Sequence, residues 1–231
     1  AILDAGTSVD VSGDDNVSLV DTIARSGNAT ITGLDVTLAG PVNAINNDII
    51  VTADNNIASN AALGGLNNTD NITLRANTGW VNATDTISAD GTANVWAGQD
   101  ITTTGTVDAT TVLMNGGNDV ALATILAAAG GADIDAGAAL TLNGDVDANA
   151  GTVTIDAGGL ITQDAAIGSD NNTASVTIAS AEGSLDSNNT IDSVGLISIT
   201  TGANVDLANA VTAGTSIAVD AGGTVDAAAI L

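Results

Sequence analysis

The chain has 231 residues, of which 45% are hydrophobic, and a net charge of −25 that comes from 27 acidic and two basic residues. It is too hydrophobic for a disordered acidic tail, and its negative charge repels nucleic acid, so we expect a folded protein without a nucleic-acid partner. The absence of cysteine excludes disulfides and cysteine-based zinc sites, and no apolar run approaches the roughly 18 residues of a membrane helix, so we expect no membrane insertion.

Aliphatic residues recur in triples along the chain. Upstream, the triples Val11, Val17, Ile23 and Ile31, Val36, Val42 follow the spacing loosely. From residue 51 onward the first gap is six or seven residues, the second is six, and the gap to the next triple varies between seven and eleven. These triples are Val51, Ile57, Leu63; Leu74, Val81, Ile87; Val95, Ile101, Val107; Met114, Val120, Leu126; Ile134, Leu140, Val146; Ile155, Ile161, Ile167; Ile178, Leu185, Ile191; Ile199, Val205, Val211; and Val219, Val225, Leu231. A period of about 20 residues is typical of a solenoid, in which each coil buries its apolar face against its neighbours.

Around each aliphatic position the residues alternate as in a β-strand. In residues 152–155 and 176–178 the aliphatic side chains lie two apart and share one face, whereas the threonines take the other. Small-residue turns such as 135–137 and 156–158 follow. The sequence therefore predicts an all-β fold, a single-stranded right-handed parallel β-helix (β-solenoid) of about eleven coils of roughly 20 residues.

A longer repeat overlies the short one. Residues 49–107 match residues 153–211 at an offset of 104, and the two widest gaps carry the same tripeptide at 67–69 and 171–173. No linker interrupts the pattern, so we expect one continuous β-solenoid over residues 1–231 with an internal duplication. Because tandem copying usually extends beyond a sampled piece, we also expect this chain to be part of a longer polypeptide.

The residue types that carry most enzyme chemistry are scarce. There is no His, Cys, Lys or Tyr, the only Glu is Glu182, and Arg25 and Arg75 are the only cations, so acid–base or nucleophilic chemistry would rest on Asp, Ser or Thr. The only adjacent carboxylates are Asp14 and Asp15, in a segment that is typical of a turn. We therefore expect no enzyme activity, and a polysaccharide-active β-helix enzyme is the least favoured alternative.

Aspartates at equivalent turns raise the question of a metal site. Asp135 and Asp156 belong to successive coils and should lie about 4.8 Å apart, close enough to repel each other or to share a cation. Residues 115–119 are faintly similar to nonapeptide calcium repeats but lack their period. We expect solvated turn carboxylates with loosely bound Ca²⁺ and no cofactor, and a specific calcium site at Asp135 and Asp156 is the alternative.

The asparagine sequons and the two tryptophans are candidates for sites on the surface of the protein. Of seven Asn-x-Ser/Thr sequons, Asn67 and Asn171 lie in the widest turns and are the most accessible candidates for glycosylation. Trp80 and Trp96, in a chain without Phe or Tyr, align with outward positions and are candidates for contact with a sugar or a neighbouring protomer. The alternative is a local shift of register that buries both tryptophans.

The strand segments at 175–178 and 216–222, the Gly-Leu-Ile-Thr-Gln turn at 159–163 and the Asn-rich loops resemble the repeat shaft of filamentous-haemagglutinin-type adhesins and related giant bacterial surface proteins. The resemblance covers nearly the whole chain. It implies a right-handed parallel β-helix, an extracellular location at the cell surface, and a role as stalk, filament or matrix.

The function that we expect is therefore that of an extracellular structural protein, either the repeat shaft of a surface adhesin or a fibre assembled by end-to-end stacking of coils. Its expected partners are the chain itself, head to tail or within a longer polypeptide, and host or matrix glycans. The alternative is a glycan- or ice-binding β-solenoid, which is favoured by outward threonines. These threonines are Thr37, Thr73, Thr154 and Thr177.

Overall fold

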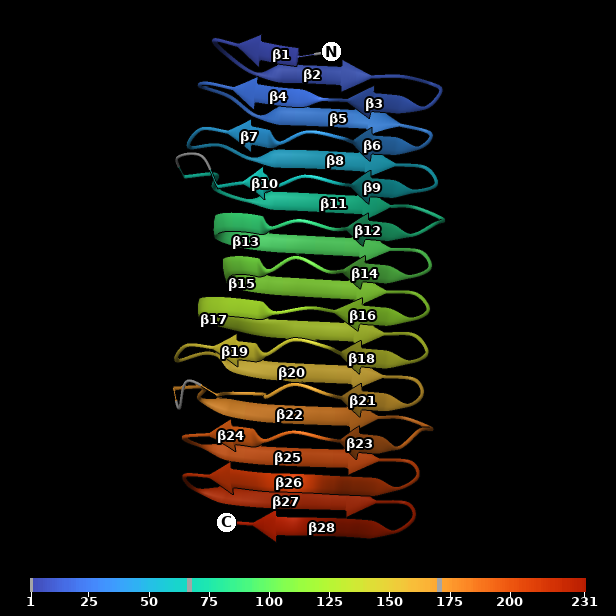
Figure 1. The fold of residues 1–231 in the computed structure, drawn as a ribbon, viewed down its shortest axis with the longest axis vertical. Coiled ribbons are helices and arrows are strands. Elements are labelled where there is room, and N and C mark those ends of the chain that lie inside the picture. Colours follow the sequence, from blue (N-terminus) through green and yellow to red (C-terminus); the bar gives the residue numbers. More distant parts are fainter. Residues whose placement is uncertain (1, 66–67, 170–171) are drawn as a thin grey trace. The chain divides into compact units, whose positions relative to one another are not determined.

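The computed structural model describes residues 2–65, 68–169 and 172–231. The described residues form parallel strands and no helix, stacked as a β-solenoid of about 11 turns of roughly 20 residues (Figure 1). This confirms the predicted all-β, parallel β-solenoid fold. The part of the chain that is described therefore also lacks any helix suited to crossing a membrane. The chain divides into two compact units, Ala1–Gly116 and Gly117–Leu231.

In the first unit each coil carries three strands, which define three faces (Figure 1). The first face contains β2 (Val9–Ser12), β5 (Ala29–Gly33), β8 (Ile49–Ala53) and β11 (Ile72–Ala76). The second contains β3 (Val17–Leu19), β6 (Val36–Leu38), β9 (Ile57–Ser59), β12 (Val81–Ala83) and β14 (Ile101–Thr103). The third contains β1 (Ile2–Ala5), β4 (Asp21–Ala24), β7 (Val42–Ala44) and β10 (Leu63–Gly64). The long strands β13 (Ile87–Ala97) and β15 (Val107–Gly116) run from the third face into the first face of the next coil.

The second unit repeats this arrangement, with its faces named in the same order along a coil. Its first face contains the end of β17 (Ile125–Ala136), then β20 (Thr152–Ala157), β22 (Ser175–Ser180), β25 (Leu196–Thr201) and β27 (Ser216–Ala221). Its second face contains β16 (Val120–Leu122), β18 (Leu140–Leu142), β21 (Ile161–Gln163), β23 (Leu185–Ser187) and the starts of β26 (Val205–Ala213) and β28 (Val225–Ile230). Its third face contains the start of β17, β19 (Val146–Ala148), β24 (Ile191–Ser193) and the ends of β26 and β28.

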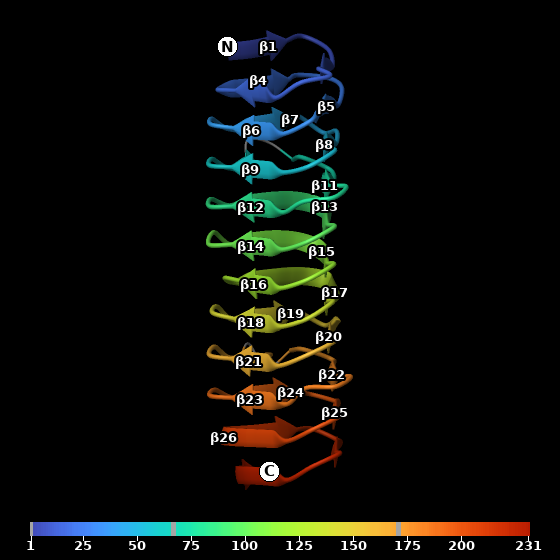
Figure 2. The same cartoon turned by 90° about the vertical axis from the view of Figure 1, so that its right-hand side faces the viewer.

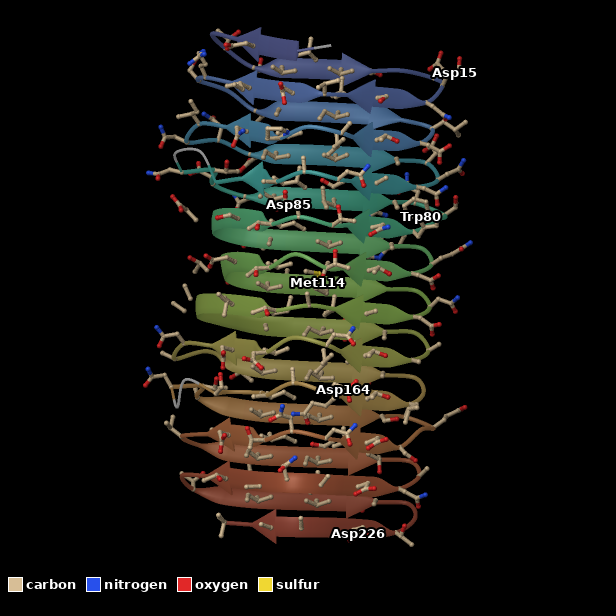
Figure 3. All side chains as sticks on the ribbon, viewed as in Figure 1. Asp15, Trp80, Asp85, Met114, Asp164 and Asp226 are labelled. Carbon is tan, nitrogen blue, oxygen red and sulfur yellow. The ribbon has the colours of Figure 1, made fainter. Side chains whose placement is uncertain are left out.

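The aliphatic columns that the sequence predicts form the core of each unit. Leu74 is in register with Val51 on one side and Val95 on the other, and all three are fully buried. Met114, labelled in Figure 3, is among the largest fully buried side chains. Parallel pairing in register stacks like residues on like, so every coil buries its apolar positions against the next coil.

Three of the predicted aliphatic positions do not point into the core. These are Ile23, Leu126 and Leu231. The inward positions belong instead to Thr22, Ile125 and Ile230. The prediction that the second gap is six residues is therefore wrong in these coils, where five residues separate the second inward position from the third. A strand exchanges its inner and outer residues when its register moves by one position.

The predicted duplication is accompanied by matching local conformations at an offset of 104. Gly64 and Gly168 both have a φ of 74°, and the non-glycine residues Asn46 and Ala150 have φ values of 53° and 61°. The two glycines lie within the repeat of 49–107 at 153–211 and the other pair lies just before it, but neither match tests whether the repeat arose by copying. That origin, and the continuity of a single solenoid over residues 1–231, stay predictions.

Candidate functional site

The second face of the first unit presents a partly exposed tryptophan between two shallow hollows. Trp80, which directly precedes β12, is 38% exposed and stands at the edge of the strands (Figure 3). One hollow has a volume of about 200 Å³ and is lined by Asp35, Val36, Thr37, Asn56, Ala58 and Trp80. The other has a volume of about 150 Å³ and is lined by Trp80, Val81, Asn82, Asp100 and Thr102. We call this surface, whose strands β6, β9, β12 and β14 face the viewer in Figure 2, the Trp80 face.

Hydrogen bonds to the preceding coils hold Trp80 in place. Its backbone N–H donates to Asn56 Oδ1 over 3.1 Å. The Asn56 side chain is itself fixed, because its Nδ2 and its backbone N–H donate to Asp35 Oδ1 over 3.0 and 3.2 Å. At Gly79 a Cβ would collide with Asn56 Oδ1, so only glycine permits this close approach. Successive coils therefore position the indole through their backbones and turn side chains.

Two rows of side chains run across the Trp80 face along the stacking direction. The row just before the strands is Asp35, Asn56, Trp80 and Asp100. The row at the middle of the strands is Thr37, Ala58, Asn82 and Thr102, paired in register. Within the described part of the chain, no group lies within hydrogen-bonding distance of the buried Oδ1 atom of Asn82. The face thus combines one aromatic surface with carboxylate, amide and hydroxyl groups.

The structure does not bring the two tryptophans together. Trp96 lies on the first face, in β13, and is half-buried. The guanidinium carbon of Arg75 lies 4.3 Å from the centroid of its ring, a cation–π contact, and Arg75 Nε donates to Asn77 Oδ1 over 2.9 Å. The sequence analysis missed this pair, although Arg75 and Trp96 each follow an aliphatic residue of the repeat, Leu74 and Val95. Neither tryptophan is fully buried, and a sugar or protomer as their partner stays a prediction.

The two aspartates named as a candidate metal site are neighbours. Asp135 in β17 is in register with Asp156 in β20, on the outward side of the first face. The sequence analysis overlooked Asp133, which shares that side because it lies two residues before Asp135. Partial burial, followed by the negative charges of Asp135 and Asp156, raises the pKa of Asp133 above its ordinary value. Among the described residues no group of three or more His, Cys, Asp or Glu is arranged to hold a metal ion, and a cation shared by Asp135 and Asp156 stays a prediction.

Several turn aspartates do more than face solvent, because they accept hydrogen bonds from the next coil. Asp48 Oδ1 accepts from the backbone N–H and the Nδ2 of Asn71, over 3.2 and 2.9 Å. In the second unit, Asp145 Oδ1 accepts from the backbone N–H of Ala166 over 2.9 Å. The recurrence of Asp and Asn about one coil apart was the signal for these contacts. The interpretation as merely solvated turns was incomplete.

Buried polar groups also join successive coils. Gln163 is fully buried, donates through Nε2 to the carbonyl oxygens of Ala165 and Thr190, and accepts from Ser187 Oγ over 2.6 Å. Asp147 is 7% exposed, and Ser169 Oγ donates to its Oδ2 over 2.9 Å. Gln163 and Asp147 thus stabilise the fold, because each finds within it the hydrogen-bond partners that a buried polar group needs.

The remaining candidates are placed as follows. Asn67 and Asn171, the candidates for glycosylation, lie outside the described residues. Asp14 and Asp15 are exposed in the turn between β2 and β3, and Asp15 is labelled in Figure 3. The four outward threonines of the ice-binding alternative are each partly exposed: Thr37, Thr73, Thr154 and Thr177. In the second unit the row of Thr154 and Thr177 continues as Ser198 and Ala218, so the hydroxyl pattern is not regular.

A scan of protein-family models, a search of curated proteins and a search of solved structures found no match for this chain.

Proposed function

We propose that this chain is a structural protein, the repeat shaft of an extracellular surface protein or fibre. The observation that carries the proposal is the in-register parallel pairing of one coil with the next within each unit, as for Leu74 between Val51 and Val95. Such stacking binds successive coils through backbone hydrogen bonds on three faces and through a continuous aliphatic core. A long, rigid support needs these properties and no reactive group.

The surface chemistry supports the same role. The net charge of −25 favours solubility and opposes nonspecific association between like-charged copies. Some of these charged groups also stabilise the turns. Asp48 and Asp145, for example, accept hydrogen bonds from the next coil. Because the chain contains no lysine and two arginines, it offers few sites to proteases that cleave after basic residues.

The proposal includes a partner, namely more of the same fold. Within each unit, successive coils present the same three faces along the stacking direction, so a further coil can add to them in the same way. The further coils belong either to the same polypeptide or to a second copy that stacks head to tail. The second case is an open, heterologous association that continues into a filament.

Antibodies raised against the folded chain test the proposed location. We expect them to label intact cells of the source organism without permeabilisation, and surface proteolysis to remove the label. An antibody against a cytoplasmic protein of the same cells serves as the control. Labelling that needs permeabilisation would overturn the proposal of a surface protein.

Sedimentation velocity tests the head-to-tail version separately. Stacking of separate copies predicts a broad series of sedimenting species that shifts to larger values as the protein concentration rises. A single monomeric species at every concentration would leave only the version in which the coils continue within one polypeptide.

A further inference from the structure

We propose that the Trp80 face binds a neutral oligosaccharide, with the indole of Trp80 packed against the C–H surface of a sugar ring. Of the two aromatic side chains, Trp80 lines both of these hollows, whereas Trp96 lines neither of them. A tryptophan left 38% exposed at such a place offers a flat apolar surface with a polar edge. A sugar ring, which has apolar C–H faces and a rim of hydroxyls, complements that combination.

The groups around the indole match the rim of hydroxyls. Asp35 uses Oδ1 to hold Asn56, and its Oδ2 is the oxygen that it offers to a ligand hydroxyl. Thr37 and Thr102 contribute hydroxyls that can both donate and accept hydrogen bonds. Asp100 lines the other hollow and belongs to the coil after Trp80, whereas Asp35 belongs to an earlier coil. Acceptors and donors thus flank Trp80 on both sides.

Asn82 adds an independent indication of a ligand. Its Oδ1 is buried and, among the described residues, has no hydrogen-bond partner, which is an unfavourable arrangement for a polar atom. The terminal torsion of asparagine is broad, so a small rotation turns the amide toward the hollow that Asn82 lines. A ligand hydroxyl in that hollow would supply the hydrogen bond that the protein does not.

Charge restricts the class of sugar. The residues that line the two hollows include two carboxylates, Asp35 and Asp100, and no basic residue. Both arginines lie elsewhere, because Arg25 pairs with Asp4 and Arg75 covers Trp96. An anionic sugar would therefore meet carboxylates of like charge and no basic side chain among these lining residues, so the ligand is a neutral glycan rather than a sulfated or uronic one.

The dimensions indicate more than one sugar ring. Each hollow, at about 150 and 200 Å³, is smaller than the roughly 300 Å³ at which pockets for drug-sized ligands begin, so each suits a single ring. Asp35 and Asp100 are separated by three coils, which corresponds to about 14 Å at the strand spacing of a β-sheet. A linear chain with a ring on each side of the indole fits this length.

Tryptophan fluorescence tests the proposal, because the chain has two tryptophans of which one lies on this face. The probes are neutral hexasaccharides of glucose, mannose and N-acetylglucosamine, with hexagalacturonate as the anionic counterpart. We expect at least one neutral probe to change the emission in a saturable manner, and hexagalacturonate to have no effect. No saturable change with any neutral probe at millimolar concentration, or stronger binding of hexagalacturonate, would overturn the proposal.

Variants then locate the site, with binding measured by calorimetry. Trp80→Ala should weaken the affinity at least tenfold, whereas Trp96→Phe, which keeps a ring under Arg75, should leave it unchanged. Asn82→Ala leaves the turn at Trp80 intact and should weaken the affinity several-fold, so the test survives if Trp80→Ala fails to fold. Equal affinity of Asn82→Ala and the unchanged protein, or loss of binding in Trp96→Phe alone, would contradict the assignment.

Discussion

At the scale of single residues, the wide turn of each unit depends on a glycine with positive φ. Gly64 and Gly168 both have a φ of 74°, where residues with a side chain are strained. A Cβ would collide with the carbonyl oxygen of Ser88 at Gly64 and with that of Asp192 at Gly168. Neighbouring coils therefore approach so closely at these points that the residue must be glycine for two separate reasons.

Gly64→Ala should lower the free energy of unfolding by about 3 kcal/mol, because alanine adds both backbone strain and the collision with Ser88. Gly65→Ala is a matched control, since Gly65 also has a positive φ, of 85°, but a Cβ there meets nothing within 4 Å. We expect Gly65→Ala to lower the free energy of unfolding by about 1 kcal/mol. Urea unfolding measures both, and equal losses would show that the close approach has no importance.

Side chains at the turns provide a second test. Asp48→Ala removes the acceptor of two hydrogen bonds from Asn71 and should lower the free energy of unfolding by about 1 kcal/mol. Asp48→Asn, which keeps an acceptor oxygen, should recover most of this loss. Asp108→Ala removes an equal charge from an exposed aspartate that, among the described residues, accepts no hydrogen bond. If Asp108→Ala destabilises the protein as much as Asp48→Ala in urea unfolding, the bonds to the next coil do not stabilise the fold.

At the scale of strands, the period of two collects like residues on one side of a face. In β17 and β20 it places Asp133, Asp135 and Asp156 together on the outward side of the first face. Partial burial and the two neighbouring carboxylates raise the pKa of Asp133. The strand that buries Ile134 thus also concentrates negative charge on its other side.

The raised pKa makes stability depend on pH in a defined direction. The Asp133 carboxyl group has its ordinary pKa of 3.8 in the unfolded state and a higher pKa in the folded state. The folded state therefore holds the proton more tightly. The contribution of Asp133 protonation to the free energy of unfolding is therefore complete below the ordinary pKa of 3.8. It is lost as the pH rises through the higher pKa of the folded state. Asp133→Asn should consequently be more stable than the unchanged protein at pH 7, and this advantage should shrink toward pH 3.

Urea unfolding at several pH values between 3 and 7 measures this difference. Asp220→Asn is the control, because it removes the same charge from an exposed aspartate that is in register with Thr200 rather than with a carboxylate. A stability advantage of Asp133→Asn that persists unchanged at pH 3, or an equal effect in the control, would contradict the explanation.

At the scale of the whole molecule, the net charge of −25 is the main unfavourable term that conditions can change. Repulsion among carboxylates of successive coils, such as Asp135 and Asp156, weakens as added salt screens the charges. The melting temperature should therefore rise with sodium chloride concentration, and rise further with calcium. Circular dichroism during heating measures it.

Magnesium at the same concentration separates two kinds of calcium effect. Equal increases with magnesium and calcium indicate loosely bound counterions, whereas a much larger increase with calcium, lost in Asp135→Asn and Asp156→Asn, indicates a specific site. A melting temperature that depends on neither salt nor divalent cations would show that repulsion between the carboxylates of successive coils is unimportant.

The amino-acid sequence by itself determined the fold. Short strands cannot bury an apolar face alone, so the spacing of aliphatic residues such as Val51, Ile57 and Leu63 has to match the coil, and this regularity is visible without coordinates. The same regularity placed Asp135 and Asp156 at equivalent positions. The scarcity of residues suited to catalysis was likewise evident from composition alone.

The tertiary structure decided what depends on contacts between coils. Ile125, rather than Leu126, points inward because the second gap, from Val120, is five residues in this coil and not six, and a shift of one residue reverses the two sides of a strand. The different surroundings of the two tryptophans have the same origin. Trp96 lies under Arg75, whereas Trp80 lies between two hollows, because each meets different residues on the neighbouring coils. A sequence pattern predicts the period of the coil. The residues that contact an outward side chain are known only from the register in which the coils stack.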